Sequence, residues 1–406
     1  MGRYSVIAVA LTLTVSLSAC TRETPEPPIA AHVPDAELAS NESPGNVASG
    51  QTIFRFDTFG DETFWTDTLH MNDVIGTKVS PKTALSVGLK VDATVIPAPV
   101  AAGIKAGTVD LNSPATTLAL LKLNAVVGVV GKVSADGKTL ERVGVTCALC
   151  HSTVDNSFAP GIGKRLDGWP NRDLNVGGII ALSPAVTPAQ KAVYTSWGPG
   201  KYDPRYNIDG KNMPVMIPPA FGLRNVAKEI YTGDGPVSYW NAYVAITQMH
   251  GHGVFSDPRV NINVNVTPDL VTSKLPALRE YQFSLNAPGA VAGTFDAAAA
   301  RRGKAVFDAT CSSCHVSGNL SDVNNGVLHA PADVGQNAAY ADRSATKKYR
   351  TTPLRGLWHA PQLKGPYFHD GSAPTLEAAV EHEAGVAKAN LSAAQKKDLV
   401  EYLKTL

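Results

Sequence analysis

Apolar residues recur at helical spacing in several stretches of the chain. Residues 297–310 form an alanine-rich amphipathic segment that leads straight into Cys311, and residues 391–406 place four large apolar side chains on one face. Residues 183–194 contain a Thr187-Pro188 pair, which suits a helix start because threonine can cap and proline fits the first turn. The same pattern predicts further helices over residues 236–249 and 374–383.

The N-terminal third alternates between two kinds of pattern. Residues 51–72 carry five aromatic side chains within about four helical turns, which predicts a helix with an aromatic core face. Residues 94–100 and 124–132 are β-branched and punctuated by glycine or proline, as strands are. Residues 130–142 contain Asp136-Gly137, a pair that tolerates the positive φ of a tight hairpin turn. We therefore expect the second hairpin strand to deliver Cys147.

One short motif occurs twice. Cys147-Ala148-Leu149-Cys150-His151 and Cys311-Ser312-Ser313-Cys314-His315 share the C-x-x-C-H spelling, and together they use every cysteine except Cys20. Two cysteines at this spacing can form thioethers with both vinyl groups of a haem, and the next histidine can bind its iron. The motif predicts two covalently bound haem c groups. Structural zinc and disulfides are the alternatives.

Composition limits the remaining choices. A chain of 406 residues can hold about two to three domains. Its 44% hydrophobic and 17% charged residues are ordinary for a globular protein. A net charge of +1 argues against a nucleic-acid partner and against a broadly electrostatic membrane surface.

The first residues have the pattern of an export signal. Residues 1–20 combine Arg3, a short apolar run and the ending Leu-Ser-Ala-Cys, which resembles a bacterial lipobox with Cys20 as the lipidated residue. The alternative is an ordinary signal peptide. Residues 21–50 are rich in Pro, Glu, Ala, Ser and Asn and predict a flexible tether. We expect a lipoprotein in the bacterial periplasm, anchored to the outer membrane.

The order of parts after each box is similar: a long connection, a proline followed by Gly-Leu, an aromatic residue before glycine, a helix and a histidine. This repeat predicts a mainly α protein with two cytochrome c-like haem domains, over residues 141–286 and 295–406. Residues 51–140 would form a β-containing N-terminal elaboration.

The axial ligands of each iron decide the chemistry. His151 and His315 are the predicted proximal ligands. For the first haem, His250 is the leading distal candidate, followed by Met249 and His252, then by Met213 and Met216. His250 or His252 could instead be a catalytic base beside an open site.

No methionine follows Cys311, so the second haem lacks a thioether ligand from its own half. His382 and Glu383 are the near candidates for its sixth position, with His359 and His369 behind them. In the loop after the first box, Arg165 or Arg172 could pair with haem propionates, although a solvated surface arginine is the alternative for each.

At these motifs the chain resembles the bacterial di-haem cytochrome c peroxidase family, which includes the di-haem enzyme that matures tryptophan tryptophylquinone. The resemblance covers residues 144–406. It is strongest over residues 302–307 with the second box and over residues 350–380, which contain Tyr-Phe-His-Asp-Gly-Ser and Thr-Leu-Glu-Ala-Ala-Val. It implies a peroxidatic N-terminal haem and a C-terminal haem that receives electrons.

The sequence departs from the family pattern at two places. Glu383 stands where the family has methionine or tyrosine, and Tyr239-Trp240-Asn241 stand where it has a distal glutamate and glutamine. The family also implies a tryptophan between the haems, for which Trp169, Trp197 and Trp240 are the candidates here, and often calcium between the domains, for which no loop here is specific.

We therefore expect a peroxidase that reduces hydrogen peroxide, or another small oxidant, with electrons from a small periplasmic cytochrome c or cupredoxin. The alternatives are a non-catalytic electron-transfer cytochrome and a di-haem oxygenase or protein-modifying oxidase. Membrane contact would be through the lipid alone, and the sequence leaves a homodimer open.

Overall fold

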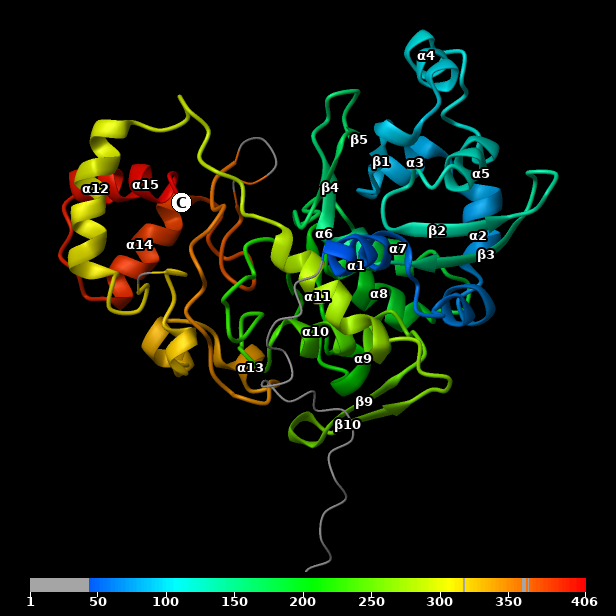
Figure 1. The fold of residues 1–406 in the computed structure, drawn as a ribbon. Helices are drawn as coiled ribbons and strands as arrows, with labels where there is room; N and C mark the ends of the chain where they lie inside the picture. Colours follow the sequence, from blue (N-terminus) through cyan, green and yellow to red (C-terminus); the bar gives the residue numbers. More distant parts are fainter. Residues whose placement is uncertain (1–43, 317, 360–362, 364) are drawn as a thin grey trace, which may run out of the picture.

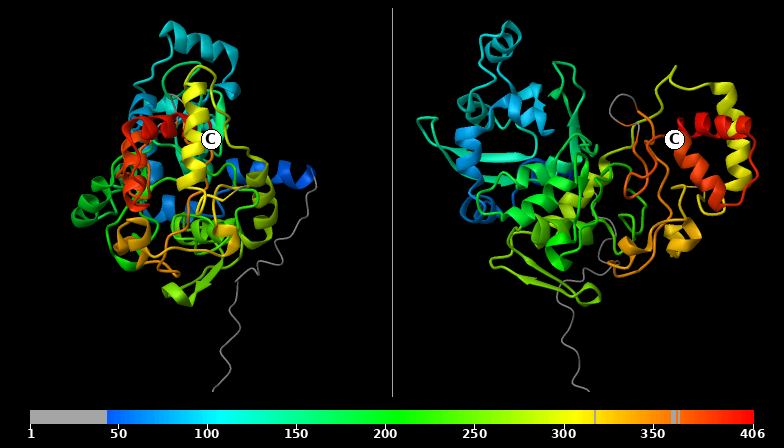
Figure 2. Two further views of the ribbon diagram at one scale, coloured as in Figure 1. Left: turned by 90° about the vertical axis from the view of Figure 1, so that its left-hand side faces the viewer. Right: turned by 180° about the vertical axis from the view of Figure 1, so that it is seen from behind.

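The computed structural model describes residues 44–316, 318–359, 363 and 365–406, and the chain forms two lobes (Figure 1). Residues 44–284 make the N-terminal lobe, and residues 297–406 make the C-terminal lobe, as the right-hand view of Figure 2 also shows from behind. The predicted leader with Cys20 lies outside the described residues. Among the helices that the structure describes, none has the length and hydropathy needed to cross a bilayer.

The C-terminal lobe is built on α12 (Ala297–Thr310), α14 (Leu376–Val386) and α15 (Ala393–Leu403). Each helix begins with a side-chain cap, from Asp296, Thr375 and Ser392 respectively. The three helices bury one apolar cluster: Phe307, Leu376, Val380, Leu399, Val400 and Leu403. These helices agree with the sequence prediction.

The N-terminal lobe has the larger core. Helix α1 (Pro44–Phe56) packs along α11 (Leu275–Ser284), so the first and last described helices of this lobe are neighbours. The Phe54 and Tyr281 rings meet edge to face, with centroids 5.5 Å apart. The residues before the first box therefore share a core with the residues that follow it.

The single aromatic helix predicted over residues 51–72 is wrong. Helix α1 ends at Phe56, a π-helix η2 covers Thr63–Thr68, and α2 (Met71–Lys78) follows. The break has a local cause: the Asp57 carboxylate accepts a hydrogen bond from the Phe59 amide at 2.9 Å, and Phe59 and Gly60 have φ of 54° and 84°.

The predicted hairpin is confirmed. Strand β2 (Val129–Val133) pairs antiparallel with β3 (Leu140–Val145), with Val129 opposite Val145 and with Gly137 at φ 74° in the turn. Residues 94–100 are not a strand, because the Asp92 side chain caps a 3-10 turn, η3 (Ala93–Val95), and prolines then start α4 (Ala98–Ala106).

The other elements are short. The helices are α3 (Pro81–Ser86), α5 (Pro114–Lys122), α6 (Ala148–His151), α7 (Val176–Ile180), α8 (Pro188–Ser196), α9 (Tyr206–Asp209), α10 (Val237–Tyr243) with its π-helical continuation η4 (Val244–Gln248), and α13 (Ala338–Ala341). The strands pair as β1 (Val91–Asp92) with β5 (Ile162–Gly163), β4 (Ser152–Val154) with β6 (Arg165–Asp167), β7 (Lys201–Tyr202) with β8 (Val215–Met216), and β9 (Val254–Asp257) with β10 (Ile262–Asn265).

Candidate haem sites

Strand β3 delivers the first box, as the hairpin pattern predicts. Cys147 follows the strand by two residues and caps the one-turn helix α6. Gly128, with φ 78°, lies so close that an added Cβ would stand 2.1 Å from the Leu149 amide nitrogen. The box backbone is therefore held by the residue that precedes the first hairpin strand.

The His151 ring is held in one orientation. Its Nδ1 lies 3.0 Å from the carbonyl oxygen of Pro218, and no residue within the described ranges bonds to its Nε2. Burial lowers the pKa of His151 to about 4, so the ring is neutral near pH 7. A neutral imidazole with Nδ1–H donated to a carbonyl is the usual form of a metal-binding histidine, with Nε2 as the ligand atom.

The second box repeats this arrangement at the end of α12. The His315 amide donates to the Cys311 carbonyl at 3.0 Å, which closes one helical turn. His315 Nδ1 lies 2.8 Å from the carbonyl oxygen of Leu320, and burial lowers the pKa of this ring as well. Both boxes thus offer an oriented, neutral imidazole beside two cysteines.

The four cysteines of the boxes fit thioether attachment better than the alternatives. All four are free thiols, without a disulfide among the described residues. The one compact group of candidate metal ligands in the described part of the chain joins Cys314 to Asp322 and His329, and leaves out Cys311 and His315. A structural zinc site built on the box would use both cysteines.

His250, the leading distal candidate for the first haem, packs against the turn formed by residues 57–64. Its ring stacks on Phe64 with centroids 3.7 Å apart, and no described residue bonds to either ring nitrogen. Burial lowers the pKa of His250, which favours the neutral ring. The same turn reaches the approach to the first box, because the Val145 amide donates to the Asp61 carboxyl group at 3.2 Å.

Of the other candidates from the first half, His252 lies against the same turn, and the methionines lie elsewhere. His252 donates its amide to the Phe59 carbonyl at 2.8 Å, and Met249 is 6% exposed within the main core. Met213 packs on the cluster around Tyr340, and Met216 lies 2.9 Å from where a Cβ on Gly371 would stand. Both of the latter methionines therefore face the C-terminal lobe.

The side chains at the family's distal position are engaged with one another or with the core. The Tyr239 hydroxyl donates to Asp257 at 2.7 Å, Trp240 is 5% exposed, and the Asn241 amide pairs with Gln282 at 2.7 Å.

In the C-terminal lobe, His382 and Glu383 are adjacent but differ in freedom. His382 Nε2 lies 3.1 Å from the Gly335 carbonyl oxygen, and its Nδ1 lies 3.4 Å from the Glu383 carboxylate. The charge of Glu383 contributes to raising the pKa of Cys311, so this carboxylate faces the second box. The His382 ring therefore contacts the Gly335 carbonyl with one nitrogen and the Glu383 carboxylate with the other.

The two more distant histidines have structural contacts. His369 is 5% exposed, and Gln336 and Tyr349 lie 3.1 and 3.3 Å from its two ring nitrogens. His359 Nδ1 lies 3.3 Å from the Gly289 carbonyl oxygen, and its ring meets Trp169 edge to face at 4.9 Å. Of the three tryptophans singled out in the sequence, Trp169 is the one with a ring contact to the C-terminal lobe.

Sequence reasoning missed Asp61, a fully buried carboxyl group near the first box. Both carboxyl oxygens accept from the Val145 amide, at 3.3 and 3.2 Å. Burial raises the pKa of Asp61 to about 9 although the bond from Val145 lowers it, so the group is protonated near pH 7. The sequence signal would have been the Asp-Thr-Phe-Gly-Asp run, whose glycine breaks the aromatic pattern.

The buried Asp61 predicts a pH-dependent stability. Between its ordinary pKa of 3.8 and about 9, the folded chain retains a proton that the unfolded chain releases. The free energy of unfolding should therefore fall as pH rises through this range, by up to about 1.4 kcal/mol per pH unit from this group. Asp61→Asn should remove this contribution, and urea unfolding of both proteins from pH 5 to 9 measures it. Parallel pH profiles would contradict the assignment.

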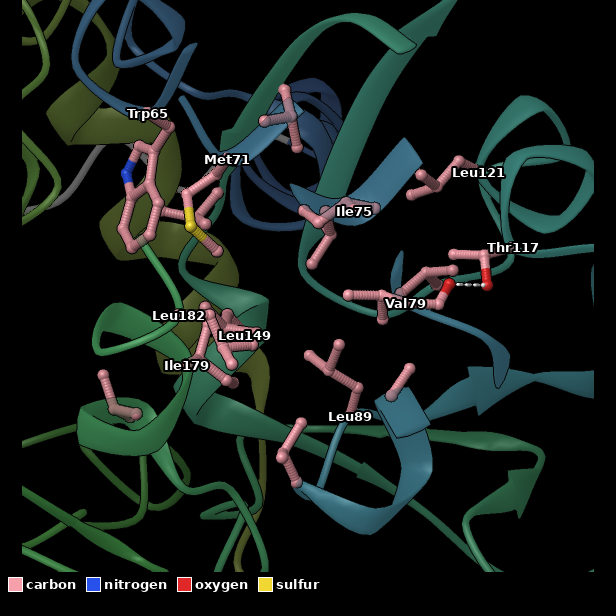
Figure 3. Close-up of a pocket in the computed structure, with 17 residues that line it drawn as sticks. Trp65, Met71, Ile75, Val79, Leu89, Thr117, Leu121, Leu149, Ile179 and Leu182 are labelled. Atoms are coloured by element: carbon pink, nitrogen blue, oxygen red, sulfur yellow. Dashed lines mark hydrogen bonds between the residues drawn. The ribbon is translucent and has the colours of Figure 1, made fainter. Parts of the chain in front are cut away.

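The first box also borders an apolar cavity of about 60 Å³ in the N-terminal lobe (Figure 3). Leu149 of the box lines it together with Ile179 and Leu182, and Trp65 and Met71 lie nearby. Among the residues that line the cavity, Thr117 donates its hydroxyl hydrogen to the Val79 carbonyl at 2.7 Å. The exposed surface of the cavity is apolar, which suits a small apolar molecule.

Comparisons with known proteins agree with the boxes. Residues 300–406, which include the second box, match the cytochrome c family. A stretch of 125 residues is 33% identical to the methylamine utilization protein MauG of Methylorubrum extorquens and covers 26% of this chain. The match spans about a third of MauG, 34% of its length.

Two solved structures have weak likeness to the fold. Hydrazine synthase of Kuenenia stuttgartiensis aligns with a TM-score of 0.34 and 17% identity, over 48% of this chain and 72% of that chain. A MauG-like protein associated with microbial copper homeostasis aligns with a TM-score of 0.33 and 18% identity, over 48% and 74%.

The oriented imidazoles, the free thiols beside them and the cytochrome c match support covalently bound haem c. Together with the partial likeness to MauG, they support the resemblance to the bacterial di-haem cytochrome c peroxidase family.

Proposed function

We propose that this protein is an exported di-haem cytochrome that reduces hydrogen peroxide at an N-terminal haem, with electrons relayed through a C-terminal haem. The four box cysteines would hold the two haems, and His151 and His315 would bind the irons. Haem iron supplies the one-electron and oxygen chemistry when it is bound. The chain would orient each haem, move protons to and from the bound oxidant, and control its access to the iron.

The difference between the two boxes is the observation that carries this proposal. On the side of the first box, His250 has a buried, neutral ring whose nitrogens have no partner within the described residues. A histidine in that state can accept a proton from a small acid such as peroxide. On the side of the second box, both histidines are engaged: His382 is bonded to backbone, and His329, within 4.8 Å of Cys314, is bonded to Asp322. Glu383 stands at the family's ligand position.

The remaining elements of the proposal concern setting and partners. We infer a periplasmic lipoprotein that is anchored through Cys20 and receives electrons from a small cytochrome c or cupredoxin. Trp169 is the aromatic side chain that supports contact between the lobes, because it follows the first box and touches His359. Calcium belongs to the relatives' pattern, the sequence leaves a homodimer open, and the described residues give specific support to neither.

Single histidine variants test the assignment of the two pockets. His250→Ala should change the absorption and EPR spectrum of the first haem alone, because its ring lies on the side of that box. His382→Ala should change the second haem alone, because it orients Glu383. Spectra of the oxidised and half-reduced protein, with and without cyanide, measure both effects.

The outcomes separate the functions. A high-spin haem that binds cyanide and reacts with peroxide supports the peroxidase. Two low-spin haems that ignore both reagents would leave a non-catalytic electron-transfer cytochrome, and either histidine variant with an unchanged spectrum would refute that pocket's assignment.

A second candidate, a di-haem oxygenase or protein-modifying oxidase, is favoured by the cavity that Leu149 lines. Peroxide is polar and gains nothing from an apolar wall, whereas a small apolar substrate or dioxygen does. Peroxide-driven turnover without any dioxygen requirement would exclude this candidate.

A further inference from the structure

Five buried arginines of the described chain share one feature. Their guanidinium groups each lie within 3.3 Å of a carboxylate: Arg165 with Asp167, Arg205 with Asp234, Arg279 with Glu280, Arg343 with Asp203, and Arg350 with Glu229. This feature is expected, because a desolvated cation without a counter-charge is costly. Arg165, the other candidate for binding a cofactor carboxylate, therefore already has a counter-charge.

Arg172 lacks this feature. Its Nε and Nη1 atoms are fully buried, and neither has a hydrogen-bond partner in the described part of the chain. The groups that face it are the phenols of Tyr231 and Tyr367, and burial without a carboxylate lowers the pKa of the guanidinium. Both phenols donate their hydrogens elsewhere, to the carbonyls of Met216 and Leu357, each at 3.0 Å.

The position of Arg172 is fixed by the first box. The Asn171 amide donates to the Cys150 carbonyl at 2.9 Å, and the Gly168 amide donates to the His151 carbonyl at 2.8 Å. From the other side, Gly200 with φ 71° lies so close that a Cβ there would stand 2.6 Å from the Arg172 carbonyl oxygen. The backbone of Arg172 is therefore clamped beside the box.

The side chain reaches the contact between the lobes. Tyr367 belongs to the C-terminal lobe, and the neighbouring Met216 amide donates to the His369 carbonyl at 2.7 Å across the same contact. Tyr231 is linked there too, because its carbonyl accepts from the Arg350 amide at 2.9 Å. The unpaired guanidinium thus lies at the contact between the lobes, on a backbone fixed beside the first box.

We propose that Arg172 binds a haem propionate. A planar guanidinium suits a carboxylate with two oxygens, and no carboxylate of the described chain occupies this position. Each haem carries propionate groups, which are carboxylates that could occupy this position. The inference rests on the proposed attachment of haem at the boxes, and it assigns Arg172 a positioning and tuning role toward that group.

Potentiometry of the holoprotein tests the proposal. Arg172→Gln removes a positive charge beside a propionate, so one haem should show a lower midpoint potential that varies with pH as the propionate becomes able to take up a proton. Arg142→Gln is the matched control, because Arg142, on hairpin strand β3, forms a solvent-exposed ion pair with Asp67. It should leave both potentials unchanged. Variants that lack one box show which haem carries the propionate.

The outcomes are distinct. Unchanged potentials of both haems in Arg172→Gln, or a change no larger than that of Arg142→Gln, would overturn the proposal. If Arg172→Gln does not fold, Arg172→Lys serves, since lysine retains the charge but loses the paired donors, and a smaller fall is expected in the same haem. An unchanged potential there would also overturn it. Fewer than two haems per wild-type chain would instead refute the proposed function.

Discussion

Replacing Cys147 and Cys150 together by serine should reduce the covalently bound haem from two groups per chain to one. Both thioethers of the first site depend on these thiols, which are free and three residues apart. The Cys311/Cys314 double variant should lose the other haem and keep the first. Haem-stained gels, pyridine haemochrome absorbance and intact mass measure the number directly. We expect the first variant to lose peroxide reactivity and the second to lose electron supply.

Cys20→Ser is the matched control, because it removes a cysteine that belongs to neither box. It should leave two haems per chain whatever its effect on the N-terminus. A first-box double variant that still carries two haems would show that this box does not hold one. A wild-type protein without any covalent haem after export would end the whole proposal.

The parts of the fold that the sequence predicted are those with local causes. Helices α12 and α15 follow from an apolar stripe together with a capping side chain, and the hairpin follows from Asp136-Gly137. The boxes are local as well, since the imidazole and both thiols lie within five consecutive residues. For these elements the information lies within a few residues of the structure that it specifies.

The parts that sequence reasoning missed depend on tertiary contacts. The aromatic pattern before residue 72 predicts one helix, but Asp57 and Gly60 break it, and the break brings Asp61 to the Val145 amide, 84 residues away. Arg165 and Arg172 have similar neighbours in sequence, yet one meets Asp167 and the other meets no carboxylate. Nothing in either local pattern encodes that difference.

The distal positions were left open for the same reason. A helix over residues 236–249 was predicted, but how His250 and His252 lie after it depends on contacts with the turn of residues 57–64. The sequence restricted the choice to a few residues, and a distant aromatic segment, which local pattern does not reveal, packs against both histidines.

Gly303→Ala should destabilise the C-terminal lobe by roughly 3 kcal/mol. Gly303 lies on α12 where this helix crosses α15, and an added Cβ would stand 1.9 Å from the Asp398 carbonyl oxygen and 2.4 Å from its carbonyl carbon. Backbone cannot move aside as a side chain can, so the two helices must separate and loosen the packing of Phe307 against Leu399. Urea unfolding, monitored at the absorption of the second haem, measures the loss.

The matched control is Gly385→Ala on α14. A Cβ at Gly385 meets no atom within 4 Å, so alanine should be neutral or raise stability by about 0.5–1 kcal/mol through its higher helix propensity. The two substitutions are chemically identical and differ in whether another backbone is in contact. If Gly303→Ala unfolds at the same urea concentration as the wild type, α12 and α15 do not cross closely, and the geometry that presents Cys311 at the end of α12 would have to be revised.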